Sequence, residues 1–459
     1  MVRDLIRQAV AVRPSPRQLA WQQLEFCAFV HVGINTFTDR EWGDGTEDPA
    51  LFCPEDLDAD QWVRAIRSAG MRGVILTCKH HDGFCLWPSA CTDHSVRSSP
   101  WMQGKGDVVG LLSRACRRAG LKFGVYLSPW DRHDPRYGTG KPYDDYYTAQ
   151  LTELATQYGE IFCFWFDGAC GEGQNGRKQE YDWERYYQVI RRYQPGATIN
   201  VCGPDVRWCG NEAGHCRPSE WSVVPAALRD TGRIQARSQQ ADDGTFARRV
   251  DPQDQDLGSR EAIRDAGPLV WYPAEVDTSI RPGWFYHPAE DGQVRTAAQL
   301  EQIYLESVGG NAALLLNVPP SPSGRIAPPD CAVLAQLGDR LRRRFGRDLA
   351  PGACCSAPAL TDGSPDTWWQ ADPGPEPPCV RLTFDRPTRL SCVVLGEYLP
   401  RGQRIESGEL WAEGRCLARF TVVGHKRICT FAPAEVRSLE LRITAARAEP
   451  CLRLLAAYE

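Results

Sequence analysis

An apolar run that ends abruptly in a carboxylate is the first candidate for chemistry in this sequence. Residues 161–166 (Ile-Phe-Cys-Phe-Trp-Phe) are followed at once by Asp167 and Gly168. Such a run is typical of a parallel-sheet strand that is buried on both faces. An acid at its end would lie at the C-terminal rim of the sheet, where α/β barrels carry their catalytic groups. The alternative is that Asp167 caps a following helix.

Further polar side chains occur at the ends of other apolar runs. His31 ends the first run, His80 and His81 end the second, and Tyr126 lies in the third. A single histidine at a strand end is usually a structural group, but three of the eight histidines at two successive strand ends are harder to explain in this way. These side chains could bind a metal ion, transfer protons or form hydrogen bonds with hydroxyl groups.

Metal binding is the sharpest alternative for the histidines. Adjacent residues of a strand point to opposite faces, so His80 and His81 could not both bind one ion without a bulge. The sequence contains neither a His-x-His nor a His-Glu-x-x-His pattern. We therefore expect no metal ion and no organic cofactor.

Aromatic residues are interleaved with these polar groups. Fifteen tryptophans are present, so several of them must belong to the core. Trp42, however, follows Glu41 in a loop rich in Gly and Asp, and Trp284 lies in a Ser-Ile-Arg-Pro-Gly-Trp segment. A flat ring on a loop can stack on the apolar face of a sugar, while carboxylates and histidines bind its hydroxyls. The mixture favours a carbohydrate ligand.

Hydrolysis of a glycoside requires a second carboxylate. Glu212 is the first candidate, because it lies between glycines in the segment Gly-Asn-Glu-Ala-Gly after the fifth expected strand. Neighbouring strands of a barrel would bring Asp167 and Glu212 to the same rim. The sequence leaves their separation open, and with it the stereochemistry. The acids that compete with Glu212 are Asp205, Glu220, Glu275 and Asp277.

Short apolar runs alternate with amphipathic helical segments between residues 26 and 346. The expected strands are residues 26–33, 73–81, 122–130, 161–167, 198–202 and 312–318, with a weaker one at 268–271. The expected helices are residues 58–70, 107–120, 143–159, 181–193, 297–308 and 332–345. This order predicts a (β/α)8-like TIM barrel of the α/β class, with one irregular or missing unit. A doubly wound sheet is disfavoured because no glycine-rich phosphate loop follows the first strand.

Two further regions differ from the barrel pattern. Residues 203–266 have little periodicity, and we interpret them as loops over the barrel mouth. Beyond the barrel, short alternating runs separated by Pro, Gly and Asp are typical of an all-β sandwich. We therefore expect two domains, a catalytic barrel at 1–346 and a C-terminal β-sandwich at 353–459. The sandwich could bind carbohydrate or could support the barrel.

Composition narrows the class of protein. The 459 residues are 42% apolar and 24% charged, an ordinary balance for a globular protein of two domains. A net charge of −5 without a basic block makes nucleic acid an unexpected partner, and no apolar run approaches the roughly 20 residues that span a membrane. The oligomeric state is left open.

The N-terminus and the cysteines bear on the compartment. Residues 1–7 carry charges where a signal peptide would need an apolar core, so we expect a cytoplasmic protein. A secreted or periplasmic location would follow if a leader had been removed. The nineteen cysteines are odd in number and scattered through the expected elements, which favours free thiols over a disulfide framework.

Five short motifs together resemble those of glycoside hydrolase family 29, the α-L-fucosidases. They occur in the family's order within residues 20–320. They are Phe-Val-His-Val-Gly at 29–33, Glu-Trp-Gly at 41–43, Lys-His-His-Asp-Gly-Phe at 79–84, Gly-Val-Tyr-Leu-Ser at 124–128 and Trp-Phe-Asp-Gly-Ala at 165–169. The Lys-His-His-Asp-Gly-Phe motif and the Trp-Phe-Asp-Gly-Ala motif together are specific for this family, whereas either alone would be a weak indication. One departure is Val32, where many members of the family carry a bulkier residue.

The resemblance implies a retaining mechanism with Asp167 as the nucleophile. It also implies a set of residues that hold fucose: His31, Glu41, Trp42, His80, His81, Tyr126 and Trp165. The loop around Glu212, with Trp284 downstream, resembles the subgroup specific for α-1,3/1,4-linked fucose of branched glycans, in which Glu212 matches the acid/base. Residues 227–262 match no part of the family pattern.

The sequence thus predicts an exo-acting α-L-fucosidase whose partner is a fucosylated oligosaccharide or glycoconjugate. Three alternatives remain: a fucosidase of broader linkage specificity, a non-catalytic glycan-binding protein on the same scaffold, and a metal-dependent barrel hydrolase.

Overall fold

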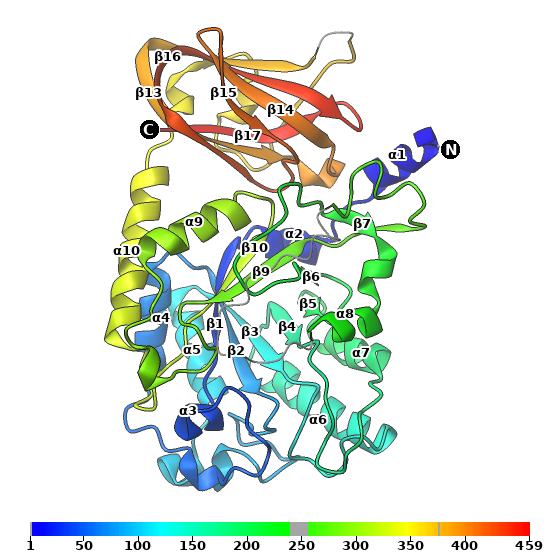
Figure 1. The fold of residues 1–459 in the computed structure, drawn as a ribbon, viewed down its shortest axis with the longest axis vertical. Helices are drawn as coiled ribbons and strands as arrows, with labels where there is room; N and C mark the ends of the chain where they lie inside the picture. The colour runs from blue at the N-terminus through cyan, green and yellow to red at the C-terminus, as the bar shows by residue number, and fades with distance from the viewer. Residues whose placement is uncertain (1, 239–255, 375–376) are drawn as a thin grey trace.

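Eight parallel strands form a nearly closed barrel in the computed structural model, which describes residues 2–238, 256–374 and 377–459 (Figure 1). Their order is β5-β4-β3-β2-β1-β10-β9-β6, and a bridge between Asn200 and Val206 joins the two edges. The strands are β1 (Phe26–Val30), β2 (Gly73–Lys79), β3 (Lys122–Leu127), β4 (Cys163–Phe166), β5 (Thr198–Val201), β6 (Arg207–Trp208), β9 (Ala274–Ser279) and β10 (Ala313–Asn317). The predicted TIM-barrel-like fold is confirmed.

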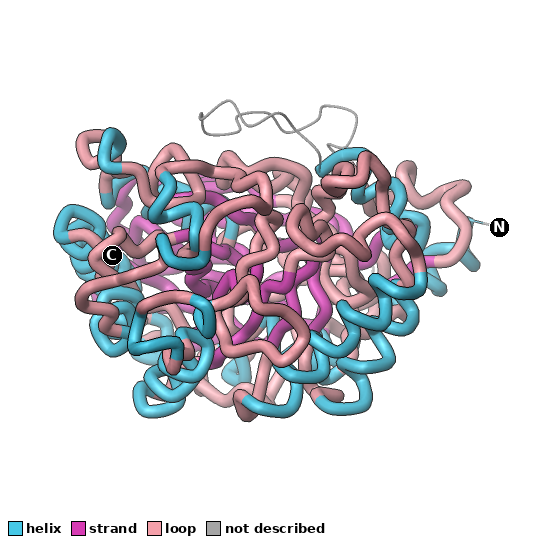
Figure 2. The backbone as a smooth tube through the Cα atoms, turned by 90° about the horizontal axis from the view of Figure 1, so that it is seen from below, coloured by secondary structure: helices cyan, strands magenta, loops and turns pink. Residues whose placement is uncertain are grey.

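Helices surround the strands, as Figure 2 shows in a view from below. The longer ones are α4 (Ala59–Ser68), α5 (Val108–Ala119), α6 (Lys141–Gln157), α7 (Trp183–Tyr193), α9 (Ala297–Ser307) and α10 (Pro328–Phe345). Carboxylates of Asp58, Asp107 and Asp182 accept hydrogen bonds from backbone N–H groups at the starts of α4, α5 and α7. These caps satisfy groups that would otherwise lack partners and fix where each helix begins. Three shorter helices lie before β2: α1 (Val2–Ala11), α2 (Pro16–Gln22) and α3 (Ile34–Thr38).

The unbroken apolar run before Asp167 is explained by two separate cores. Cys163 and Trp165 of β4 belong to the cluster inside the barrel, whereas Phe164 and Phe166 pack in the larger cluster between the strands and the helices. Successive residues of a strand point to opposite faces, and here both faces are buried. No position of β4 therefore favours a polar side chain until the strand ends.

The prediction of a barrel strand at residues 268–271 is wrong, and the seventh barrel strand in chain order is β9 instead. Those residues contribute β8 (Leu269–Trp271), which pairs in antiparallel fashion with β7 (Val223–Pro225) outside the barrel. β9 was missed because it carries Glu275 and Asp277, which give it a polar sequence. Both acids are buried and accept hydrogen bonds from tryptophan N–H groups, so the strand is stable despite its composition.

The region between β5 and β9 contains several short elements. Besides β6 and β7, it contains a 3-10 turn at Ala226–Arg229 and the helix α8 (Thr231–Ser238). Within the unassigned segment 227–262, residues 239–255 lie outside the described residues.

The C-terminal domain is an antiparallel β-sandwich with its own apolar core. Its two longest strands carry register shifts, which bend them around that core. The strands are β11 (Cys354–Cys355), β12 (Trp369–Gln370), β13 (Cys379–Glu397), β14 (Ile405–Ala412), β15 (Arg415–Phe420), β16 (Arg427–Ala446) and β17 (Cys451–Tyr458).

The sandwich contacts the end of the barrel at which β1 begins (Figure 1). Glu25, just before β1, accepts hydrogen bonds from His425 Nε2 at 3.1 Å and Lys426 Nζ at 2.6 Å. These interactions hold the pKa of Glu25 well below its usual value against the effect of burial. Burial lowers the pKa of His425, and its hydrogen bond to Glu25 opposes this shift.

Two expectations about the whole chain can be compared with the structure. All nineteen cysteines lie in described parts of the chain and are free, as expected. Over those same parts, no helix has the length and apolar character needed to cross a bilayer.

Candidate active site

Asp167 lies directly beyond the end of β4, and its two carboxylate oxygens have different partners. Tyr126 Oη donates to Oδ2 at 3.0 Å, and the N–H of Ala169 donates to Oδ1 at 2.8 Å. The contact with Ala169 is a local turn and not a helix cap, because the next helix begins only at Trp183. Burial raises the pKa of Asp167, while these hydrogen bonds oppose the rise. The side chain is still 21% exposed, so a ligand can reach it.

His31 lies at the end of β1 and is oriented by Asn317 at the end of β10. Asn317 Nδ2 donates to Ser279 Oγ at 2.9 Å and to the carbonyl of Trp284 at 2.8 Å. Its Oδ1 is therefore an acceptor for His31 Nδ1, 2.8 Å away, which must carry the proton. Burial lowers the pKa of His31 to about 3, so the ring is neutral and its Nε2 is an acceptor.

His80 and His81 lie beyond the end of β2 at Lys79, and their ring centroids are 4.1 Å apart. The expectation that they point to opposite faces of a strand is wrong because the strand stops before them. Ser128 Oγ donates to the carbonyl of Trp130 and accepts from His81 Nδ1 at 2.7 Å. Burial lowers the pKa of both histidines, that of His81 to about 3.

The neutral state of His81 gives it a defined role. Its Nε2 lies 3.8 Å from Asp167 Oδ2, and with Nδ1 protonated it is an acceptor. A ligand hydroxyl can donate to this nitrogen beside the carboxylate. Lys79, which precedes the histidines, instead points to the helical layer, where Nζ donates to Asp131 Oδ2 and Gln150 Oε1, each at 2.9 Å.

Aromatic rings form the walls around these groups. Trp42 lies edge-on to His81 with a centroid distance of 5.5 Å, and Trp284 lies 5.1 Å from His31. Trp165 stacks on Tyr126 at 5.3 Å inside the barrel. Of the other aromatic side chains in this region, the ring of Trp130 lies 5.0 Å from that of His81.

Glu41 positions the loop that carries Trp284. Its Oε2 accepts from the N–H of Trp284 and its Oε1 from the N–H of Phe285, both at 2.8 Å. His287 Nε2 lies 2.8 Å from Oε1 and its Nδ1 lies 2.7 Å from Asp39 Oδ1. The hydrogen bond to Glu41 raises the pKa of His287 to about 9, so this histidine is a cation that binds both Glu41 and Asp39.

Glu212 lies in the loop after β6 and is half-buried. Gly210 and Gly214 on either side of it have φ of +104° and +91°, a region that disfavours other residues. Glu212 is close enough to Asp277 of β9 to raise the pKa of that acid, which burial raises further. Trp208 Nε1 donates to Asp277 Oδ1 at 2.7 Å. Glu212 and Asp277, one of the acids that compete with it, therefore lie together.

The remaining acids have other structural partners. Glu220 forms buried ion pairs with Arg207 and Arg217, which lower its pKa against the effect of burial. Asp205 pairs with Arg191. Glu275 accepts from Trp165 Nε1 at 2.6 Å and Asn200 Nδ2 at 3.0 Å inside the barrel, where burial raises its pKa to about 7.

The loop that carries Glu212 is anchored at its far end by the sandwich. Arg217 Nη1 donates to the carbonyl of Cys209 at 2.8 Å and so closes the loop on itself. Thr421 Oγ1 and Arg427 Nη2 of the sandwich both donate to the carbonyl of Pro218, at 2.7 and 3.1 Å. The C-terminal domain therefore supports this loop from the outside.

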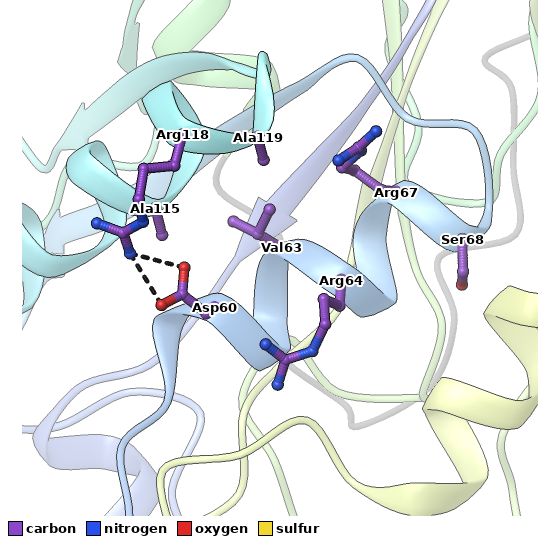
Figure 3. A pocket seen from close by; sticks show the side chains of 8 residues that line it. All are labelled: Asp60, Val63, Arg64, Arg67, Ser68, Ala115, Arg118 and Ala119. Atoms are coloured by element: carbon purple, nitrogen blue, oxygen red, sulfur yellow. Dashed lines mark hydrogen bonds and ion pairs between the residues drawn. The ribbon is translucent and has the colours of Figure 1, made fainter.

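Within the described residues, no group of three or more His, Cys, Asp or Glu side chains is placed to bind a metal ion. A cavity of about 530 Å³ lies on the outside of the barrel between α4 and α5, where Asp60 pairs with Arg118 (Figure 3). None of the side chains expected to bind fucose lines it.

One rim of the barrel thus combines acids of raised pKa, neutral imidazoles and aromatic rings. This is the arrangement of a barrel glycoside hydrolase, in which acids act on the glycosidic bond and the other groups hold the sugar.

Comparisons with known proteins identify the family. Residues 21–344 match the profile of the family described as Alpha-L-fucosidase. Alpha-L-fucosidase 1 of Arabidopsis thaliana is 38% identical over 466 residues, which cover 97% of this chain and 87% of the relative. The chain belongs to the α-L-fucosidase family, glycoside hydrolase family 29, and is an enzyme that acts on fucosylated glycans.

Solved structures agree with this assignment. A glycoside hydrolase 29 family member from an unknown rumen bacterium is 37% identical, with a TM-score of 0.80 over 97% of this chain and 77% of that chain. A Ruminococcus gnavus GH29 fucosidase in complex with fucose is 27% identical, with a TM-score of 0.84 over 98% of this chain and 95% of that chain.

The contact between Tyr126 and Asp167 provides a test of the site. Tyr126→Phe removes a hydrogen bond to a charged group, which contributes about 1.5–3 kcal/mol, so kcat/KM on an aryl fucoside should fall roughly 10- to 100-fold. This hydrogen bond lowers the pKa of Asp167, so its loss raises that pKa. Because attack requires the ionised acid, the acid limb of the pH profile should move to higher pH. Tyr193→Phe, at an exposed tyrosine of α7, is the control. An unshifted acid limb would contradict the assignment.

Proposed function

We propose that this enzyme is a retaining exo-α-L-fucosidase that releases terminal α-1,3/1,4-linked fucose from branched oligosaccharides or glycans. The observation that carries the mechanism is the anchoring of Asp167 by Tyr126 and Ala169 beside the acceptor nitrogen of His81. A carboxylate that is held in one orientation, is partly accessible and lies among sugar-binding groups is suited to attack an anomeric carbon.

In the first step, Asp167 attacks the anomeric carbon of fucose and the glycosidic bond breaks. Glu212 gives its proton to the departing oxygen as the bond cleaves. The proximity of Asp277 supports an acid pair at this position, because burial and the nearby Glu212 raise the pKa of Asp277 and two close carboxyl groups resist simultaneous ionisation.

In the second step, Glu212 takes a proton from water, which attacks the fucosyl-enzyme ester and regenerates Asp167. Two inversions at the same carbon leave the anomeric configuration unchanged. The fucose is held by hydroxyl contacts to His31, His80 and His81 and by the rings of Trp42, Trp165 and Trp284, while Glu41 orients the loop of Trp284. No metal ion or cofactor takes part.

The proposed linkage specificity rests on two loops. The glycine-flanked segment around Glu212 and the segment 279–284 that ends in Trp284 resemble those of enzymes restricted to branched α-1,3/1,4-linked fucose. Each loop has a defined anchor, Arg217 for the first and Glu41 for the second.

Replacement of the nucleophile tests the mechanism. Asp167→Asn keeps the shape of the side chain but removes the nucleophilic charge, so turnover of an aryl fucoside should fall by about 10⁴-fold with folding intact. Proton NMR of the wild-type reaction should show α-fucose as the first product. First release of β-fucose would contradict double displacement, and near-normal activity of the variant would remove Asp167 from its role.

Glu212→Ala tests the acid/base. Hydrolysis of fucosides with poor leaving groups should be lost, whereas an activated aryl fucoside should still form the fucosyl-enzyme. Added azide should then restore turnover and yield a fucosyl azide, because a small anion can replace the missing base-activated water. Asp277→Asn is the matched comparison, since the two acids are close. If azide restored the activity of Asp277→Asn but not that of Glu212→Ala, Asp277 would be the acid/base.

The linkage proposal is tested with natural substrates. A branched trisaccharide with α-1,4-linked fucose should be hydrolysed with a higher kcat/KM than a trisaccharide with α-1,2-linked fucose. The discrimination should be at least about tenfold, the effect of one well-placed contact. A preference for the α-1,2 linkage would remove the subgroup assignment and leave the family assignment unchanged.

A further inference from the structure

A cavity of about 520 Å³ lies between α8 and the loop that joins β4 to α7. The loop contributes Cys170, Lys178 and Trp183 to its lining, and α8 contributes Thr231, Gln235 and Ala236. The loop that forms one wall therefore follows Asp167, the proposed nucleophile, in the sequence. The other wall, α8, belongs to residues 227–262, which match no part of the family pattern.

α8 packs directly against the backbone next to Asp167. A Cβ atom on Gly168 would lie 2.1 Å from Ser238 Oγ and 3.2 Å from Ile234 Cγ2, so only glycine allows this approach. Ile234 also packs against the aromatic cluster inside the barrel, as does Trp208 at the start of the loop of Glu212. One face of α8 is thus fixed at the barrel mouth, and the residues that line the cavity lie on the adjoining face.

The position of α8 in the barrel indicates what the cavity can hold. β4 carries Asp167, β5 follows it, and β6 leads to the loop of Glu212. α8 contacts the β4 end of this arc at Gly168, and its Ile234 packs against the same apolar cluster as Trp208 of β6. In an exo-acting glycosidase the terminal sugar fills the barrel mouth, and the rest of the glycan must extend past the acid that protonates its oxygen. The cavity beside α8 is lined by Cys170 of the loop that begins with Asp167, so it lies next to the mouth that the terminal sugar would fill.

The chemistry of the lining suits a neutral, hydroxyl-rich ligand. Lys178, Gln235 and Thr231 present ammonium, amide and hydroxyl groups, and the half-buried ring of Trp183 offers an apolar surface. The floor is rigid, because Gln179 Oε1 accepts from the N–H groups of Gly138 and Gly140 at 3.0 and 3.1 Å. Polar groups over a fixed floor with one flat ring are typical of a subsite for sugars.

We propose that this cavity binds the sugars of the leaving group, and that α8 is the element of this chain that selects longer fucosylated oligosaccharides over simple fucosides. The inference rests on the proposed exo-fucosidase mechanism and adds a binding subsite to it. The ligand is a neutral oligosaccharide of two or more residues beyond the fucose.

The experiment compares two substrates on one variant. The double variant Lys178→Ala/Gln235→Ala should retain kcat/KM on an aryl fucoside, which has no sugar in its leaving group. Its kcat/KM on a branched fucosylated tetrasaccharide should fall about tenfold or more, as expected for the loss of two hydrogen bonds. Arg233→Ala, at an exposed position of α8 that does not line the cavity, is the matched control and should leave both values unchanged.

A second measurement does not depend on turnover of the oligosaccharide. The defucosylated trisaccharide should inhibit aryl fucoside hydrolysis by the wild type and by Arg233→Ala, and about tenfold more weakly in the double variant. An equal fall on both substrates, or unchanged hydrolysis of the tetrasaccharide, would overturn the subsite. Failure of the wild type to hydrolyse any fucoside would instead remove the proposed function, so the two failures are distinguishable.

Discussion

The burial of ionisable groups at one end of a closed parallel sheet is the constraint on which the site depends. Because the barrel excludes water from its interior, the charged forms of acids and imidazoles are disfavoured there. His31 and His81 are consequently neutral acceptors, and the pKa values of Asp167 and Glu275 are raised. Hydrogen-bond donors in fixed positions then determine which of these buried groups can carry a charge. The hydrogen bond from Tyr126 favours the ionised form of Asp167, the carboxylate that we propose as the nucleophile.

Support for the site comes from the outside of the barrel as well as from within. The sandwich joins the barrel near Glu25, at the opposite end of β1 from His31. It nevertheless reaches the loop of Glu212 through the contacts of Thr421 and Arg427 with Pro218. A long loop with two glycines of positive φ has many alternative conformations, and an anchor at its far end reduces them. The sandwich thus contributes to the geometry of the site as a buttress of the barrel.

The sequence predicted most of the barrel because its strands are buried on both faces and the helices α4, α5 and α7 begin at carboxylate caps. It failed at β9, where Glu275 and Asp277 replace the apolar residues that mark a buried strand. Their hydrogen bonds to tryptophan N–H groups arise only after folding, so no local pattern records them. The same reason explains why Asn317 was missed. Its importance lies in fixing the tautomer of His31, a partner 286 positions away in the chain.

Residues with family motifs and residues without them occupy different parts of the mouth. In the proposed function, the motif residues surround the fucose and must match its hydroxyls. α8 comes from the segment without a motif, yet it contacts Gly168, the residue next to Asp167. A small change in this helix can alter the surface that faces the leaving group without disturbing Asp167, whose own anchors are Tyr126 and Ala169. Because Asp167 and α8 are held by different contacts, the specificity for the leaving group can vary while the chemistry at Asp167 is retained.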